Sequence, residues 1–146
     1  MPDELHSPMN WTFWALLSAF FAGVTAVLAK IGVADIDSNL ATAIRTAVVL
    51  LFTWAIAFAT SPPAALAGLS RRTWTFLALS GLATGLSWLC YFRALQLGQA
   101  SRVASVDKLS VVFAIALAAL FLHETLTWQH WVGGAFVIIG AIILAV

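Results

Sequence analysis

The chain has 146 residues, of which 62% are hydrophobic and only 9% are charged, and its formal net charge is +1. Soluble domains carry about 25% charged residues, so a water-soluble chain of this length could not bury so much apolar surface. The small net charge and the lack of a basic stripe in the sequence exclude a nucleic-acid partner.

Five apolar stretches follow one another along the chain. A helix of about 20 apolar residues crosses the roughly 30 Å hydrocarbon core of a bilayer, so we expect an all-α integral membrane protein, a five-helix bundle in contact with membrane lipid. The acidic leader Met1–His6 does not resemble the basic start of a signal peptide, so we expect the first span to be retained. We expect one membrane domain over residues 1–146, with spans at 11–33, 39–60, 74–95, 103–122 and 128–146.

Polar residues mark where several of these spans begin and end. Asp37 or Ser38 can cap the second helix, and Pro62 and Pro63 cannot continue it. Gly98 is a candidate cap for the end of the third. None of the spans contains proline, so we expect no sharp kink.

Glycines recur at spacings that let helix backbones approach closely. We expect packing within one bundle rather than a dedicated dimer contact. The residues are Gly81 and Gly85, which form a GxxxG pattern, and Gly133 and Gly140, which lie two turns apart.

The two membrane faces differ in composition. The N-terminus and the loops at 61–73 and 123–127 share one face, where most of the tryptophans gather as an interfacial belt. Arg71 and Arg72 lie on that face, against Arg102, Lys30 and Lys108 on the other. Such a near-even tally sets no strong orientation under the positive-inside rule. It is what a chain inserting both ways would show, and many single-orientation proteins show it too.

Ionisable residues inside the spans gather near the second face. Charges in hydrocarbon are costly and usually face a protein interior or an aqueous path, so they mark a candidate substrate path or gate. Trp88 and Tyr91 approach the same face. The complete candidate set is Lys30, Arg45, Trp88, Tyr91, Arg93, Asp107 and Lys108.

Arg45 is the deepest of these cations. It either snorkels to the surface or points inward, and we favour an inward Arg45 that pairs with Asp107 or with a substrate carboxylate or phosphate. Side chains of adjacent helical residues point about 100° apart, so Asp107 is expected to pair across helices with Arg45 or Arg93 rather than with Lys108.

The sequence does not predict a metal site or an enzyme active site. His123, Glu124 and His130 lack the spacing of a zincin motif, so we expect no metal. No nucleophile and base stand together, so we expect neither an enzyme nor a cofactor.

Several motifs resemble the EamA domain of the drug/metabolite transporter superfamily, in its short five-helix branch. They are Ala29-Lys-Ile-Gly32, Ser38–Thr46, Tyr91–Ser105, Phe121–Thr127 and the glycine-punctuated closing helix Trp131–Gly140. In that family a glycine commonly precedes the glutamate that matches Glu124, whereas this chain has His123.

The resemblance implies a transporter of a small polar metabolite or drug in a prokaryotic inner membrane. Most family members carry two five-helix repeats, which are inverted because five is odd, as in many alternating-access transporters. A single repeat is therefore expected to act as a homodimer, antiparallel in the simplest case. A parallel dimer and a heteromer with a paralogue are the alternatives. From another class, a non-transporting membrane subunit that packs against a partner membrane protein stays open.

Overall fold

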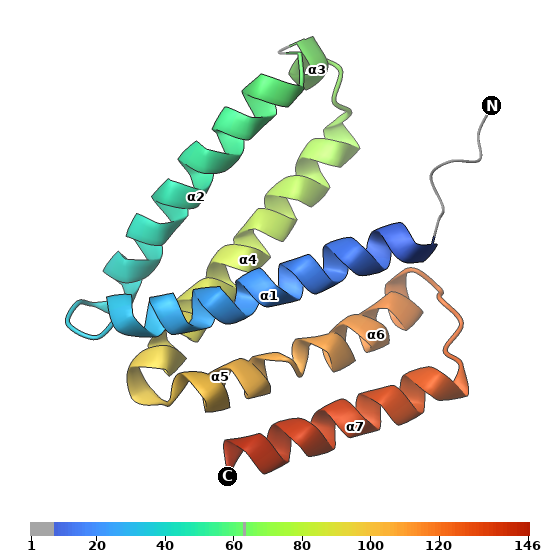
Figure 1. The fold of residues 1–146 in the computed structure, drawn as a ribbon. Helices are drawn as coiled ribbons and strands as arrows, with labels where there is room; N and C mark the ends of the chain where they lie inside the picture. The colour runs from blue at the N-terminus through green and yellow to red at the C-terminus, as the bar shows by residue number, and fades with distance from the viewer. Residues whose placement is uncertain (1–7, 63) are drawn as a thin grey trace. The chain divides into compact units, whose positions relative to one another are not determined.

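The computed structural model describes residues 8–62 and 64–146, so the acidic leader lies outside the described part of the chain. Every regular element within these residues is a helix, and five of the helical stretches are long and apolar enough to cross a membrane. The expected all-α fold with five spans is thus confirmed (Figure 1). The helices are α1 (Pro8–Gly32), α2 (Ser38–Thr60), α3 (Ala64–Ala67), α4 (Arg71–Leu97), α5 (Ala100–Asp107), α6 (Ser110–Phe121) and α7 (Trp128–Ala145).

The chain folds as two compact units, here called the α2–α4 unit and the α1/α5–α7 unit. The first comprises residues 32–97. The second comprises α1 up to Ile31 together with residues 98–146.

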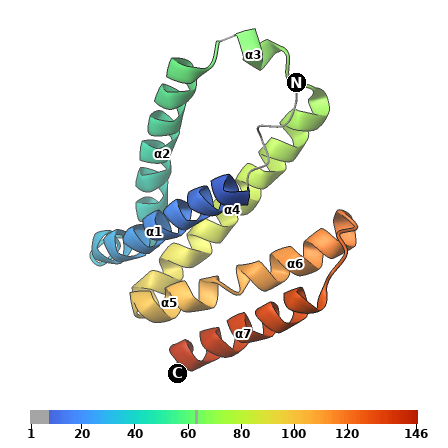
Figure 2. The ribbon, with the colours of Figure 1, turned by 45° about the vertical axis from the view of Figure 1, so that its right-hand side comes forward.

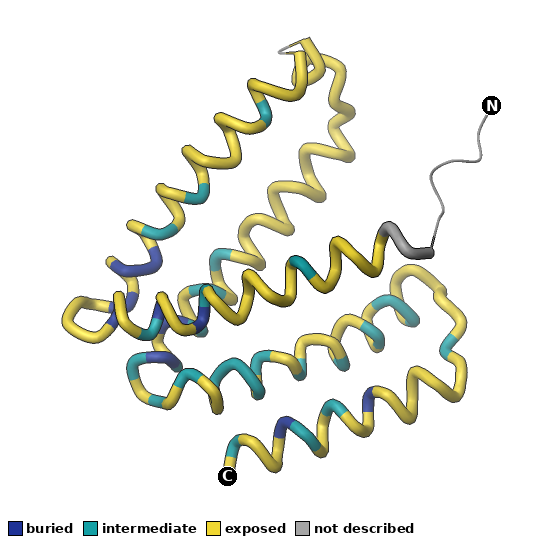
Figure 3. The backbone as a smooth tube through the Cα atoms, viewed as in Figure 1, coloured by how far each residue is buried: buried dark blue, intermediate teal, exposed yellow. Residues whose placement is uncertain are grey.

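In the α2–α4 unit, α2 and α4 pack against each other as an antiparallel pair connected through the short α3 (Figure 2). Burial is concentrated where α2 begins and α4 ends, at Val33, Ala41, Phe92 and Leu95 (Figure 3). Small residues on α2 let the two helices approach at this end. The opposite ends of both helices are exposed within the chain.

The ends of α2 follow the expected signals. Asp37 is its N-cap, and the Asp37 carboxylate accepts hydrogen bonds from the backbone N–H groups of Asn39, at 2.9 Å, and Leu40, at 3.1 Å. The helix ends at Thr60, directly before Ser61 and Pro62. The Ser70 hydroxyl accepts the Thr73 N–H at 3.1 Å, and α4 therefore begins at Arg71, three residues before the expected start.

Hydroxyl groups within α2 are satisfied by the helix itself. Thr42, Thr46 and Thr53 donate to the carbonyls four residues earlier, at 2.8, 2.7 and 2.8 Å. A hydroxyl in hydrocarbon has no water to bond, so this back-bonding lets threonine occupy a membrane span at little cost. These residues are therefore explained without any ligand.

In the α1/α5–α7 unit, α7 packs against both α5 and α6.

The fourth span was expected to be one continuous helix, and here the structure differs. Lys108 and Leu109 interrupt it, and hydrogen bonds around them reach back three residues instead of four, from Lys108 N–H to Ser105 at 3.2 Å and from Leu109 N–H to Val106 at 3.0 Å. The break contains neither proline nor glycine. It falls beside the charged pair Asp107 and Lys108, and a tight turn of this kind inside a helix often marks a hinge or local strain.

Candidate functional site

The deepest charged side chain in the α2–α4 unit packs on aromatic rings. The guanidinium carbon of Arg45 lies 4.2 Å from the centre of the Trp88 ring and 5.5 Å from that of Phe92. Trp88 and Phe92 are one turn apart on α4, so both rings face the same neighbour. Asp37 sets where α2 begins, and this start places Arg45 about 10 Å along the helix.

Contact with aromatic rings offsets much of the free-energy cost of placing the Arg45 charge in a membrane span. A cation over an aromatic face gains up to about 2 kcal/mol when desolvated. An arginine at the centre of a membrane helix costs about 2.5–3.5 kcal/mol on insertion scales. The rings therefore offset most of the penalty of placing the guanidinium there. The N–H groups at its edge still need acceptors.

Arg45 is thus directed at α4. Within residues 32–62 and 64–97, no carboxylate lies within ion-pairing distance of it. Tyr91 is half-buried on α4, one turn from Trp88. The sequence-derived pairing of Arg45 with an anion stays a prediction, whereas the aromatic platform was not foreseen, although Trp88 itself was among the candidates.

A second polar group in this unit fastens the turn between α1 and α2. The side-chain amide of Gln96 donates to the carbonyl of Ile36 at 2.7 Å and to that of Val33 at 3.4 Å. Arg93 in turn donates to the Gln96 side-chain oxygen at 3.0 Å. Arg93 is exposed and acts in this structure as a brace for Gln96, a residue that sequence reasoning missed. A glutamine at the end of an apolar span was the available signal.

Lys30 has a similar role in the α1/α5–α7 unit. Its ammonium donates to the carbonyl of Gly98 at 2.8 Å. Gly98 follows the last residue of α4, where the sequence places a candidate cap, and its φ is not positive, since no described glycine has a positive φ. Lys30 bonds its carbonyl.

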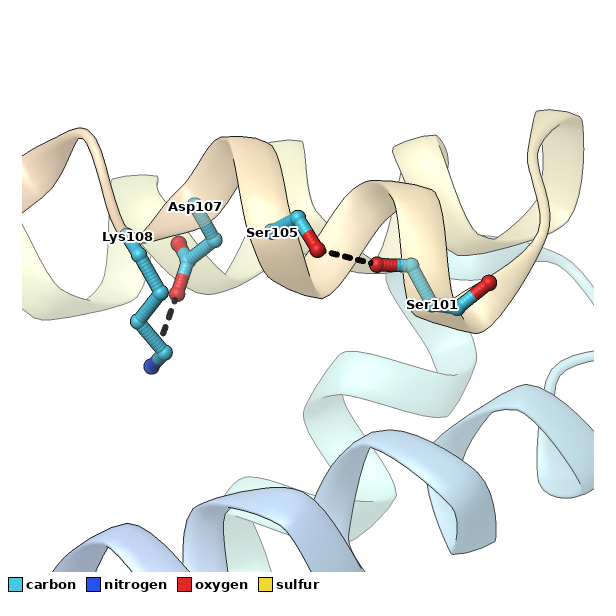
Figure 4. Close-up of polar contacts among 4 residues, drawn as sticks. All are labelled: Ser101, Ser105, Asp107 and Lys108. Carbon is cyan, nitrogen blue, oxygen red and sulfur yellow. Dashed lines mark hydrogen bonds and ion pairs between the residues drawn. The ribbon is translucent and has the colours of Figure 1, made fainter. Parts of the chain in front are cut away.

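Asp107 and Lys108 pair with each other, against expectation. The Asp107 carboxylate lies 3.7 Å from the Lys108 ammonium (Figure 4). Lys108 begins the interruption of the fourth span, and the expected pairing of Asp107 across helices with Arg45 or Arg93 stays a prediction. One turn earlier, the Ser105 hydroxyl donates to the Ser101 carbonyl at 2.7 Å, so this hydroxyl is internally satisfied. Both charged side chains are exposed within the chain and need water or another protein surface in a membrane.

An apolar groove of about 590 Å³ runs between α6 and α7. Val112, Ile115 and Gly134 are among the residues that line it, with His130 and Trp131. His130 is engaged as a cap: its ring nitrogen Nδ1 accepts the N–H of Thr127 at 3.1 Å at the start of α7. No group of three metal-ligating side chains occurs among residues 8–62 and 64–146.

Comparison with known proteins decides the family. The model of the EamA-like transporter family matches residues 9–146. The chain belongs to the EamA-like transporter family. It is 56% identical over 137 residues to a Sinorhizobium protein named "Uncharacterized transporter in cobO 3'region", covering 94% of this chain and 97% of the relative. It is 33% identical over 76 residues to an uncharacterized protein of Methanocaldococcus jannaschii, covering 52% of this chain and 56% of that one. No solved structure matches the chain.

Membership of the EamA-like family and five apolar helices make the chain a multi-pass integral membrane protein. One residue after α6 has a strained backbone. His123 has a φ of 53° and follows the end of α6. Side chains rarely adopt this left-handed conformation, and helix ends commonly use glycine for it. A histidine thus takes a backbone conformation that glycine adopts more easily.

The glycines expected to pack helices face open space within this EamA-like chain. A Cβ added at Gly81, Gly85, Gly133 or Gly140 would meet no described atom within 4 Å. The close helix approach expected at these positions therefore stays a prediction, and its partner helix is still to be identified.

Proposed function

We propose that the protein transports a small polar metabolite or drug across a prokaryotic inner membrane, as a dimer that works by alternating access. The family match over residues 9–146 is the observation that carries this proposal, because it spans one set of five helices. The Sinorhizobium relative is matched along 97% of its own length, which supports a functional unit made of single repeats. Bacterial and archaeal relatives support the choice of membrane.

The even distribution of lysine and arginine supports an antiparallel dimer. Two such copies would provide the inverted pair of repeats on which alternating access commonly relies. The interruption of the fourth span supports the same mechanism, because transporters often build their paths from broken helices. The exposed Asp107 and Lys108 beside the break would then face the path or the second copy.

Within this proposal the candidate residues divide into three groups. Arg45, Trp88 and Tyr91 would line the substrate path, and Asp107 with Lys108 would act at a gate. Lys30, through the Gly98 carbonyl, and Arg93, through the Gln96 side chain, would brace the ends of the spans.

Reconstitution in proteoliposomes tests the function. Purified protein should move a solute from a panel of amino acids, other metabolites and cationic drugs faster than protein-free liposomes do. Arg45→Ala and Asp107→Asn should each slow transport by about tenfold or more, as expected for loss of a charged group that contacts the solute or gate. Transport that survives both substitutions contradicts the site assignment. A protein that moves no solute and purifies with a larger membrane protein would instead be a non-transporting subunit.

A further inference from the structure

Within the described part of the α2–α4 unit, the N–H donors of Arg45 meet no hydrogen-bond acceptor, although this residue lies in a membrane span. The guanidinium carbon lies over the Trp88 ring, 4.2 Å from the ring centre. The guanidinium forms no hydrogen bond with residues 32–62 and 64–97. Arginine carries five N–H donors in a rigid planar fork, and that fork matches a carboxylate through two parallel bonds.

The acidic groups of the α2–α4 unit do not compensate Arg45. Residues 32–97 contain two acidic residues, Asp35 and Asp37. Both aspartates lie in or beside the turn before α2, and Asp37 already accepts two backbone N–H groups. A cationic ligand would meet Arg45 without a compensating carboxylate from this unit.

The single positive charge of Arg45 favours a ligand with a single negative charge. Arg45 offers one positive charge in a largely apolar setting, where uncompensated charge is costly. A monoanion would leave the site neutral, whereas a doubly charged phosphate would leave it negative. Half-buried Trp88 and buried Phe92 beside the guanidinium suit an organic carboxylate whose remaining surface is apolar or neutral.

We propose that the guanidinium edge of Arg45, held in place by Trp88, binds the carboxylate of a monoanionic organic substrate. This inference rests on the proposed transport function and names its substrate class. Trp88 is a positioning residue here, because it acts on the substrate through Arg45.

Matched pairs of small molecules test the proposal on the detergent-solubilised full chain. Lactate, phenylacetate and nicotinate each have an amide counterpart of nearly the same shape, namely lactamide, phenylacetamide and nicotinamide. A ligand that binds only the folded state raises the melting temperature by mass action. At least one carboxylate should raise it at concentrations where its amide does not, and inorganic phosphate should be without effect.

Substitutions of Arg45 test whether the rise in melting temperature depends on this residue. Arg45→Gln should require about tenfold or more carboxylate for the same rise in melting temperature, because a charge-assisted pair is lost. Arg45→Lys keeps the charge without the fork and should fall between Arg45→Gln and the original protein. Arg72→Gln is the matched control, since Arg72 also lies over a ring of α4, 5.8 Å from the centre of Phe76, at the far end of the helix. It should leave the response unchanged.

Two results would overturn the inference: no carboxylate stabilises the protein, or Arg45→Gln and Arg45→Lys both respond as the original does. The melting temperatures of the unliganded variants show whether each still folds. If proteoliposomes transport neutral or cationic solutes at the same rate with Arg45→Gln, the substrate class is wrong while the transport function stands. If no solute of any class is transported, the proposed function itself fails.

Discussion

The ammonium of Lys30 donates a 2.8 Å hydrogen bond to the carbonyl of Gly98, which fastens the end of α1 to the turn that precedes α5. The two residues are 68 positions apart in the sequence, so this bond connects distant parts of the chain. Lys30 is half-buried, which makes the bond harder for water to replace.

Replacing Lys30 by methionine should destabilise the protein. The substitution keeps an unbranched apolar stem and removes a charged donor, so the free energy of unfolding should fall by about 1.5–3 kcal/mol. Thermal unfolding in detergent measures the change. Lys108→Met is the control, because the loose, exposed pair with Asp107 should contribute less than about 1 kcal/mol. A larger loss at Lys108 than at Lys30 would contradict this assignment of roles.

Arg93 and Gln96 should contribute to the free energy of unfolding in a coupled way. Gln96→Leu removes the bonds to the Ile36 and Val33 carbonyls and should cost about 1–2 kcal/mol of unfolding free energy. Arg93→Met should cost less, because its side chain is exposed and contacts the turn only through Gln96. A double-mutant cycle should give a coupling of about 0.5 kcal/mol, and additive effects would show that the observed bond contributes nothing.

His123→Gly should raise the melting temperature. The histidine has a φ of 53°, a region that costs a residue with a Cβ about 1–2 kcal/mol, while glycine enters it freely. Part of this gain is offset by the greater freedom of glycine in the unfolded chain, so a net gain of about 1 kcal/mol is expected. His123→Ala retains the Cβ and should give no such increase. Equal effects of the two substitutions would assign the change to loss of the imidazole instead.

A cysteine at Ala65, in a Cys90→Ala background, should report orientation. Ala65 lies in α3, within the loop that joins α2 to α4. If the chain inserts both ways, about half of the molecules should react with an impermeant thiol reagent from outside intact cells, and the rest only after permeabilisation. Labelling from one side alone would exclude the antiparallel dimer.

Sequence reasoning predicted the spans because membrane insertion depends on length and hydropathy, both of which are local. Asp37 as a cap and the end of α2 before Ser61 and Pro62 were likewise local signals and are confirmed. The interruption at Lys108 was missed because neither proline nor glycine marks it. The Asp107–Lys108 pair was not expected, because side chains of adjacent residues on a regular helix point about 100° apart.

The candidate site was predicted only as a set of residues near one end of the spans. Charge inside an apolar run identified Arg45, but the Trp88 ring that it stacks on comes from a helix 43 positions further along, and no local pattern links them. Gln96 is uncharged and so escaped a search based on charge, although its bonds to Ile36 and Val33 hold the turn before α2.

Counterflow in proteoliposomes tests the central claim most directly. Vesicles preloaded with the carboxylate that best stabilises the protein are diluted into buffer that contains a trace of the same compound in labelled form. The original protein should accumulate label transiently, Arg72→Gln should behave in the same way, and Arg45→Gln should be slower by about tenfold or more. Counterflow that is absent, or equally fast with Arg45→Gln, would contradict the account.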